Sequence, residues 1–250
     1  QNLFGVKAQL QFGKLFVTTI ASTQRGKVAS IDIPGGNSGQ GRPFQLVASG
    51  YDENRHFFLG HFFRDNFQRW LANPPQIYSG INITRVEVYI LNRNNDTRTL
   101  RNVVGLMDLA EPSRIYNSSV TPSGSNLPNA NEANNLFAAV RNLDRNADAI
   151  NGLLDSYFAG EGNNGTDYEK ITGARILSPT EYTFHRQLGY ITLTRKLQND
   201  EAIAVAYEYT FNGRSYKVGE LSEDYASRPD NEVVFLKLLR PRKVSIRDQA

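Results

Sequence analysis

Two histidines and several acidic side chains lie close together in one aromatic stretch of the sequence. The run YDENRHFFLGHFFRDNFQRW, residues 51–70, contains His56, His61 and Asp65 among seven aromatic residues. In a helix, His61 and Asp65 share one face because they are four residues apart, whereas His56 and His61 diverge by ~140°. A His-x3-Asp pair supplies two of the ligands that a metal ion needs. The stretch is therefore either half of a metal site or a packed structural element.

The other residues that could complete a metal site are far away or absent. His185 lies in a separate predicted strand, and the chain has no cysteine, which excludes disulfides, thiolate metal sites and a cysteine nucleophile. The structural interpretation is that His56 and His61 hydrogen-bond backbone groups beside a buried aromatic cluster. We therefore expect no metal and no cofactor, with His61 and Asp65 as the metal candidates to be tested.

The same stretch predicts a helix over residues 57–71 that packs on a neighbouring sheet. Aromatic side chains recur on adjacent helical turns, which is typical of an amphipathic helix. The predicted structural core consists of Phe58, Phe62, Phe63, Phe67 and Trp70.

Acidic residues recur in adjacent pairs, such as Asp52-Glu53 and Glu223-Asp224. Adjacent side chains point apart in a strand, so neither pair is a two-carboxylate glycosidase centre by itself. A carboxylate hydrolase would need the fold to bring two of Asp52, Glu53, Glu208 and Glu223 into one pocket. The sequence contains no nucleophile elbow, phosphate loop or dinucleotide fingerprint. We therefore expect a protein that is not an enzyme.

The composition indicates a β-rich, turn-rich protein. The 250 residues include 40% hydrophobic residues, 20 glycines and one methionine, and the formal net charge is +3. Basic and acidic residues are interleaved, which argues against nucleic-acid binding. No stretch approaches the ~20 apolar residues of a membrane helix, whereas membrane strands need only ~10 alternating residues. The start at Gln1, with no signal-like segment, leads us to expect an internal fragment or a mature piece.

The clearest pattern is an amphipathic hairpin at the start of the chain. Apolar residues alternate strictly over residues 3–12, Gly13-Lys14 offers a two-residue turn, and residues 15–22 return as a second strand. Each arm is long enough to cross an outer membrane when tilted. The alternative is an ordinary hairpin at a sheet edge.

The remaining periodicity predicts a mainly β fold with two helices, in the α+β class. The second helix is predicted over residues 132–158. Strands are predicted over residues 81–92 (with a change of phase near Thr84), 101–109, 174–177, 181–185, 190–195, 203–211, 215–218 and 233–239.

These elements suggest four parts. They are the hairpin at 1–33, a β/helix half-domain at 43–112, a loop or linker at 113–131, and a helix-plus-sheet half-domain at 132–243 that could share one core with 43–112. The glycine-rich run Pro34–Pro43 is predicted to be a loop.

Longer runs of the sequence resemble one protein family. YDENRHFFLGHFFRDNFQRWL, INITRVEVYILN, RNVVGLMDLAEP, LGYITLTRKLQNDEAIAVAYEYTFNGRSYKVGE and VVFLKLLRPRKV are similar to successive motifs of the SprA (Sov) family. That family is the giant outer-membrane translocon of the type 9 secretion system of Bacteroidetes, which also serves gliding motility. The resemblance runs in the family's order from Gln1 to about Lys243.

The resemblance implies a non-enzymatic segment of a β-barrel protein that exports folded cargo. The hairpin would supply barrel strands, and the residues between it and 233–239 would form a sheet-plus-helix insertion. Short turns of such barrels face the periplasm, which would place the insertion on the cell-surface side, with the periplasmic side as the alternative. The implied partners are the outer membrane, other type 9 secretion components and folded cargo, and we expect no small-molecule ligand. The remaining alternatives are a carbohydrate- or peptide-binding β-sandwich and the carboxylate hydrolase.

Overall fold

The computed structural model describes residues 3–12, 15–24, 52–91, 100–124, 128–159 and 164–243. The chain divides into two compact units, residues 1–47 and 48–250, which are treated separately below. No described helix is both long and apolar enough to span a membrane.

The first unit contains the N-terminal hairpin. Strand β1 (Leu3–Phe12) pairs antiparallel with β2 (Leu15–Gln24), and Phe12 opposite Leu15 is the innermost pair. Both predicted strands are confirmed, and the second is two residues longer than expected. The predicted turn at Gly13-Lys14 and the loop Pro34–Pro43 lie outside the described residues.

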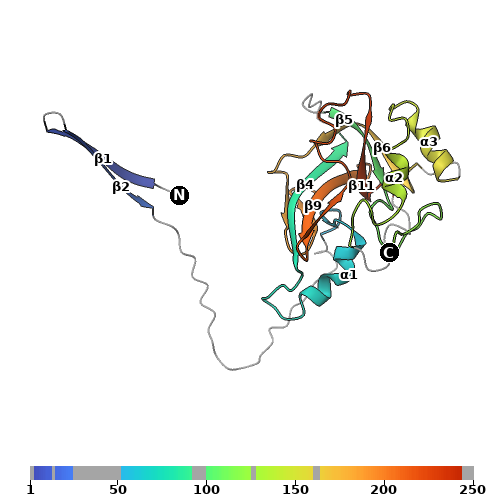
Figure 1. The fold of residues 1–250 in the computed structure, drawn as a ribbon, viewed down its shortest axis with the longest axis horizontal. Helices are drawn as coiled ribbons and strands as arrows, with labels where there is room; N and C mark the ends of the chain where they lie inside the picture. Colours follow the sequence, from blue (N-terminus) through green and yellow to red (C-terminus); the bar gives the residue numbers. More distant parts are fainter. Residues whose placement is uncertain are drawn as a thin grey trace. The chain divides into compact units, whose positions relative to one another are not determined.

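The second unit is mainly β, which confirms the predicted fold class (Figure 1). Its elements are β3 (His56–Phe58), α1 (His61–Trp70), β4 (Ile81–Leu91), β5 (Leu100–Leu106), α2 (Leu136–Val140), α3 (Ile150–Tyr157), β6 (Tyr168–Ile176), β7 (Tyr182–His185), β8 (Tyr190–Leu193), β9 (Ile203–Phe211), β10 (Arg214–Val218) and β11 (Val233–Arg240).

Five strands of this unit close into a barrel-like ring. Strand β9 pairs with β4 along one edge, and with β11 and β10 along the other. The ring continues from β11 to β5, to β6 and back to β4, with β5 and β11 parallel and the other pairs antiparallel. Two strands from residues 43–112 and three from residues 132–243 therefore form one closed sheet, in which β6 separates β4 from β5.

Apolar side chains fill the inside of the ring, with glycine and alanine where β5 approaches β9. Gly105 of β5 approaches Ala204 of β9, although these strands are not paired, so the two residues meet across the interior. The buried cluster on this face consists of Tyr89, Val103, Ile171, Ala174, Ala202, Ala204, Ala206, Leu221, Tyr225, Val234 and Leu236. A ring of five strands has little interior volume, which explains the glycine and the row of alanines.

The larger side chains of the same strands point outward into the main core. In β9, Ile203, Val205, Tyr207 and Tyr209 are fully buried on the face opposite the alanines. The helices and the three-stranded sheet β3-β8-β7 contribute to this outer core, so both faces of β9 are covered. The strand accordingly reads as apolar on both faces rather than as an alternation with polar residues.

Two helix predictions are corrected by the structure. The predicted helix over 57–71 begins only at His61, because residues 56–58 pair with β8 and Gly60 is extended, with φ −177° and ψ 167°. The predicted helix over 132–158 is two short helices, α2 and α3. Between them the side chain of Asp144 accepts the N–H of Asn146, and Asn146 forms a bridge with Glu232, so the backbone bonds locally and to a distant strand instead of continuing a helix.

Candidate functional site

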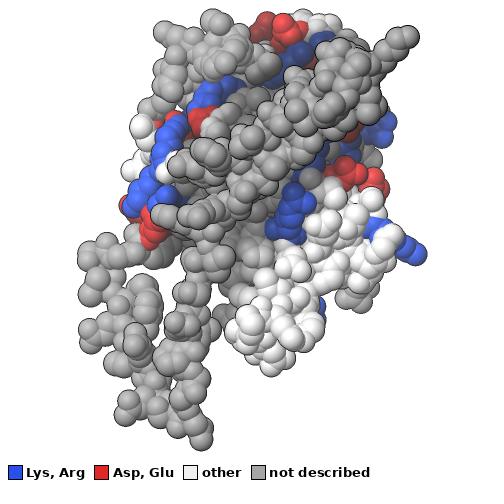
Figure 2. All heavy atoms as spheres, turned by 90° about the vertical axis from the view of Figure 1, so that its left-hand side faces the viewer, with Lys and Arg blue, Asp and Glu red and all other residues white. Residues whose placement is uncertain are grey.

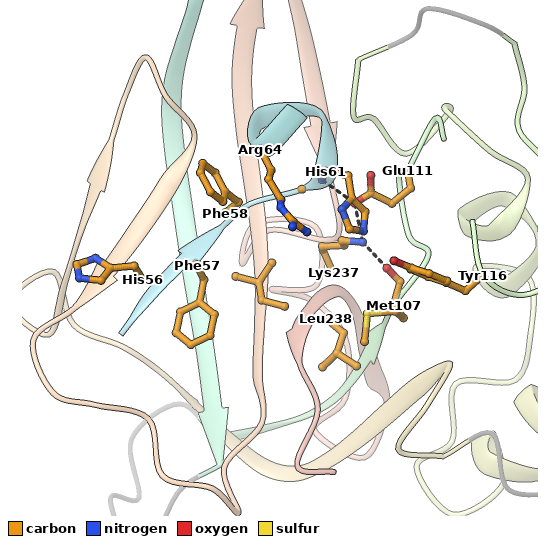
Figure 3. Close-up of a pocket in the computed structure, with 12 residues that line it drawn as sticks. His56, Phe57, Phe58, His61, Arg64, Met107, Glu111, Tyr116, Lys237 and Leu238 are labelled. Carbon is orange, nitrogen blue, oxygen red and sulfur yellow. Dashed lines mark hydrogen bonds and ion pairs between the residues drawn. The ribbon is translucent and has the colours of Figure 1, made fainter. Parts of the chain in front are cut away.

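A pocket of 390 Å³ lies where β3, the start of α1, the end of β11 and the turn after β5 meet (Figure 3). Phe57 lies on one side of it, and the side chains of His61, Arg64 and Lys237 converge on the other; Leu238 and Leu239 also line the pocket. The pocket therefore has an apolar wall and a polar wall, and the polar wall contains the groups that could do chemistry.

The centre of the polar wall is a buried ion pair between Lys237 and Glu111. Lys237 Nζ lies 2.8 Å from Glu111 Oε1, and the two side chains are 4% and 1% exposed. The ammonium group also donates to the carbonyl oxygen of Met107. Because β11 carries the lysine and the turn after β5 carries both acceptors, this pair fastens the turn to the sheet. A buried pair of this kind costs desolvation energy, which the mutual attraction must offset.

Glu111 also accepts a hydrogen bond from the first residue of helix α1. The backbone N–H of His61 donates to Glu111 Oε1 at 3.3 Å. Gly60 precedes the helix and has no side chain of its own to cap it; a Cβ there would lie 2.4 Å from Asn129 Nδ2. A distant carboxylate therefore takes the place of the usual capping residue, where its negative charge is favoured by the helix dipole.

Asp108 lies on the same turn and is also buried. Its Oδ2 accepts the backbone N–H groups of Tyr116 at 3.0 Å and Asn117 at 2.8 Å, whereas Oδ1 is buried without a hydrogen-bond partner. Burial raises the pKa of the Asp108 carboxyl above its ordinary value, although the two N–H groups and Lys237 act in the opposite direction. Glu111 Oε2 is likewise buried and unpartnered.

The predicted metal candidates, His61 and Asp65, contact different partners. His61 faces the pocket, and its ring makes an edge contact with Tyr116 at 6.2 Å between centroids. Asp65 pairs instead with Arg114 at 3.0 Å. Burial lowers the pKa of His61 below its ordinary value, which favours the neutral imidazole, although nearby Glu111 acts in the opposite direction. Within the described ranges, no group of three or more His, Asp or Glu side chains could hold a metal ion.

The other two histidines, His56 and His185, also have partners of their own. His56 is exposed on β3, where Nδ1 lies 2.9 Å from the hydroxyl of Thr192 and Nε2 lies 3.4 Å from Asp52. His185 stacks on Tyr190. These contacts are made with side chains, rather than with the backbone groups expected of His56 from the sequence.

The acidic residues of the hydrolase alternative occupy different places. Asp52 pairs with Arg55 at 3.2 Å, and Glu223 pairs with Arg85 at 2.5 Å. Glu208 lies on β9, and Glu53 is exposed in the turn before β3. None of the four lines a described pocket.

The predicted aromatic core lies where α1 meets the outer face of the ring. Phe63 is fully buried, and its ring makes edge contacts with Tyr207 and Tyr209. Trp70 is also buried. Phe58, Phe62 and Phe67 are partly buried and pack against this core.

A second hollow of 660 Å³ lies beside α2 and β10. Five of its charged lining residues pair with one another: Arg145 holds both oxygens of Glu220 at 2.9 Å, Arg228 holds Glu220 at 3.0 Å, and Lys217 pairs with Asp224. The same interleaving of basic and acidic side chains is visible among the coloured residues of Figure 2. These charges fasten loops to the sheet.

Lys237, Glu111 and Asp108 are not among the site residues predicted from the sequence. A signal for Lys237 was present, because it is the one charged residue in the apolar strand VVFLKLL. A lysine inside such a strand requires a buried acceptor, but the pattern does not say which one.

Comparison with known proteins gives one match. Residues 1–197 match the family model SprA_N, described as motility related/secretion protein. No curated protein matches the chain.

Replacing Glu111 alone should strongly destabilise the domain. Glu111→Ala leaves the buried ammonium of Lys237 without its carboxylate, and removing one partner of a buried pair costs about 3–5 kcal/mol. The double variant Glu111→Leu/Lys237→Met should lose less, because no charge then stays buried alone. Urea denaturation measures both free energies of unfolding.

The matched control is Lys217→Ala, which breaks a partly exposed pair and should cost only about 0–1 kcal/mol. A Glu111→Ala variant as stable as this control would contradict the structural role of the buried pair.

Proposed function

Since the chain belongs to the SprA_N family of motility related/secretion proteins, we propose that it is a non-enzymatic structural segment of an outer-membrane protein-export translocon. The system would be the type 9 secretion system of Bacteroidetes, which also serves gliding motility. The family match over residues 1–197 is the observation that carries this proposal.

The contacts in the pocket are consistent with a structural role. Glu111 binds Lys237 and the first N–H of α1, and Asp108 binds two backbone N–H groups of the following loop. These buried ionisable groups thus hold the turn after β5, the helix and β11 together. In this proposal the second unit is a rigid fold attached to the wall of the translocon.

The proposed partners are other outer-membrane components of the secretion system and the folded cargo that passes through it. The hairpin β1–β2 would contribute strands to the wall, and the second unit would face the cell surface. The interleaved charges of this unit favour contact with proteins over nucleic acids.

Removing the second unit should abolish export while the cell envelope stays intact. Cells whose translocon lacks residues 51–230 should retain a reporter cargo that the unaltered translocon secretes. The level of the shortened protein in the outer membrane and the secretion of a cargo of a different export system serve as controls. Normal secretion of the reporter, with the shortened protein present at its usual level, would refute the proposed role.

Surface labelling tests which side of the outer membrane the second unit faces. The chain contains no cysteine, and Ser123 is exposed, so Ser123→Cys provides a single site within these residues. An impermeant thiol reagent should label this cysteine in intact cells. Labelling that occurs only after the outer membrane is permeabilised would place the unit in the periplasm instead.

A further inference from the structure

The pair formed by Lys237 and Glu111 combines an amine and a carboxyl group that are both removed from water. Their side chains are 4% and 1% exposed, and Nζ lies 2.8 Å from Oε1. The carbon Cδ is bonded to that oxygen, so the amine nitrogen is next to an electrophilic centre. Apposition of this kind converts a slow reaction between two molecules into one within a single molecule.

We propose that Lys237 and Glu111 form an intramolecular amide bond between Nζ and Cδ. The bond from Nζ to Cδ forms, and the bond from Cδ to Oε1 breaks. The ammonium form of the lysine brings three hydrogens and the amide keeps one; the other two leave with Oε1 as water. The reaction needs no oxidant, reductant or cofactor.

The surrounding groups favour both the attack of Nζ on Cδ and the departure of Oε1. The nucleophile in this reaction is the lysine nitrogen in its neutral amine form. The carbonyl oxygen of Met107 accepts a hydrogen bond from Nζ and holds it beside the carboxyl group. The N–H of His61 donates to Oε1, which withdraws electron density from the carboxyl group. Since Glu111 lines the pocket, the water that is released has an adjacent space to enter.

We assign the proton transfer to Asp108, whose carboxyl group is close enough to Lys237 to interact with it electrostatically. It lies three residues before Glu111 on the same turn, and the N–H of Glu111 donates to its backbone oxygen at 3.3 Å. Its Oδ1 is buried without a partner, and burial favours the protonated carboxyl. A protonated Asp108 can give a proton to the leaving oxygen and take one back from the amine nitrogen.

The amide would lock the ring at its parallel pair. Strand β11 pairs with β5 from Val233 to Lys237, and Glu111 follows β5 after a short turn. A covalent bond at this point ties the last strand of the ring to the segment that follows β5. In a protein that bears load, such a bond keeps these segments together when noncovalent contacts break.

Peptide mapping of the whole protein isolated from its own cells tests the bond directly. Trypsin releases residues 102–114, which contain Glu111, as one peptide when no bond is present. With the bond, trypsin no longer cleaves after Lys237, so the 102–114 peptide is recovered joined to a longer peptide that continues past Lys237 to the next cleavage site. The mass of the joined species is the sum of these two peptides reduced by one water. The free 102–114 peptide should be depleted correspondingly. Recovery of both peptides unjoined in full yield would overturn the proposal, and this test requires no variant.

Two variants assign the roles of the residues. Lys237→Arg keeps a positive charge but has no amine nucleophile, so it should abolish the joined peptide; a joined peptide that persists would overturn the assignment to Lys237. Asp108→Asn should lower the joined fraction at least several-fold in freshly made protein; an unchanged fraction would overturn the role of Asp108.

Lys217→Arg is the matched control, because Lys217 and Asp224 form an ion pair whose side chains are about one-third exposed, at 33% and 32%. This variant should leave the Lys237–Glu111 bond unchanged. Loss of the joined peptide in Lys217→Arg would show that the mapping reports general instability and would count against the proposal.

Discussion

The fold of the second unit depends on closing five strands around an interior with almost no space. Gly105 marks the tightest point, because a Cβ there would lie 2.9 Å from Leu238 Cδ1 and 3.3 Å from Ala204 Cβ. The interior face accepts glycine and alanine at the points of closest approach, and larger residues only where the strands diverge. Shape complementarity at this density leaves little tolerance for an added methyl group. The arrangement of the outer layer follows from this constraint.

Because the inward positions of β9 are alanines, its bulky side chains point outward and must be covered. Helix α1 brings Phe63 onto Tyr207 and Tyr209, and Gly189 makes room for the Phe63 ring, since a Cβ there would lie 2.0 Å from it. The start of α1 is held by Glu111, which is itself held by Lys237 on β11. These contacts therefore join the ring, the helix and the polar wall of the pocket, as expected if the unit has a structural role in protein export.

Local sequence pattern predicts most of the strands, but it does not predict that five of them close into a ring. The apolar run in residues 203–211 indicates β9 directly, and the change of phase near Thr84 corresponds to a shift of register between Ile83 and Arg85. Asn212-Gly213 forms the turn between β9 and β10, with positive φ at both residues, which is the conformation that an Asn-Gly hairpin turn favours. No local signal states that β4 and β11 flank the same strand, because strand partners are chosen by contacts between distant residues.

The helices and the site were less predictable for the same reason. The aromatic spacing of residues 57–60 fits a helix, but pairing with β8 overrides that preference. Lys237 and Glu111 are separated by more than a hundred residues, so their contact exists only after the ring has closed. The sequence shows that a buried lysine needs an acceptor, but only the fold determines that the acceptor is Glu111.

Hydrogen exchange of a Gly105→Val variant tests most directly whether the closed ring organises the unit. The added side chain should meet Leu238 and Ala204 across the interior and lower the free energy of unfolding by at least about 1–3 kcal/mol. Amides of β5, β11 and β9 should lose protection together, because the ring opens as one unit, whereas Gly152→Ala in α3, where a Cβ meets nothing within 4 Å, should leave them protected. Full protection of these three strands in Gly105→Val would contradict the closed ring as the organising feature.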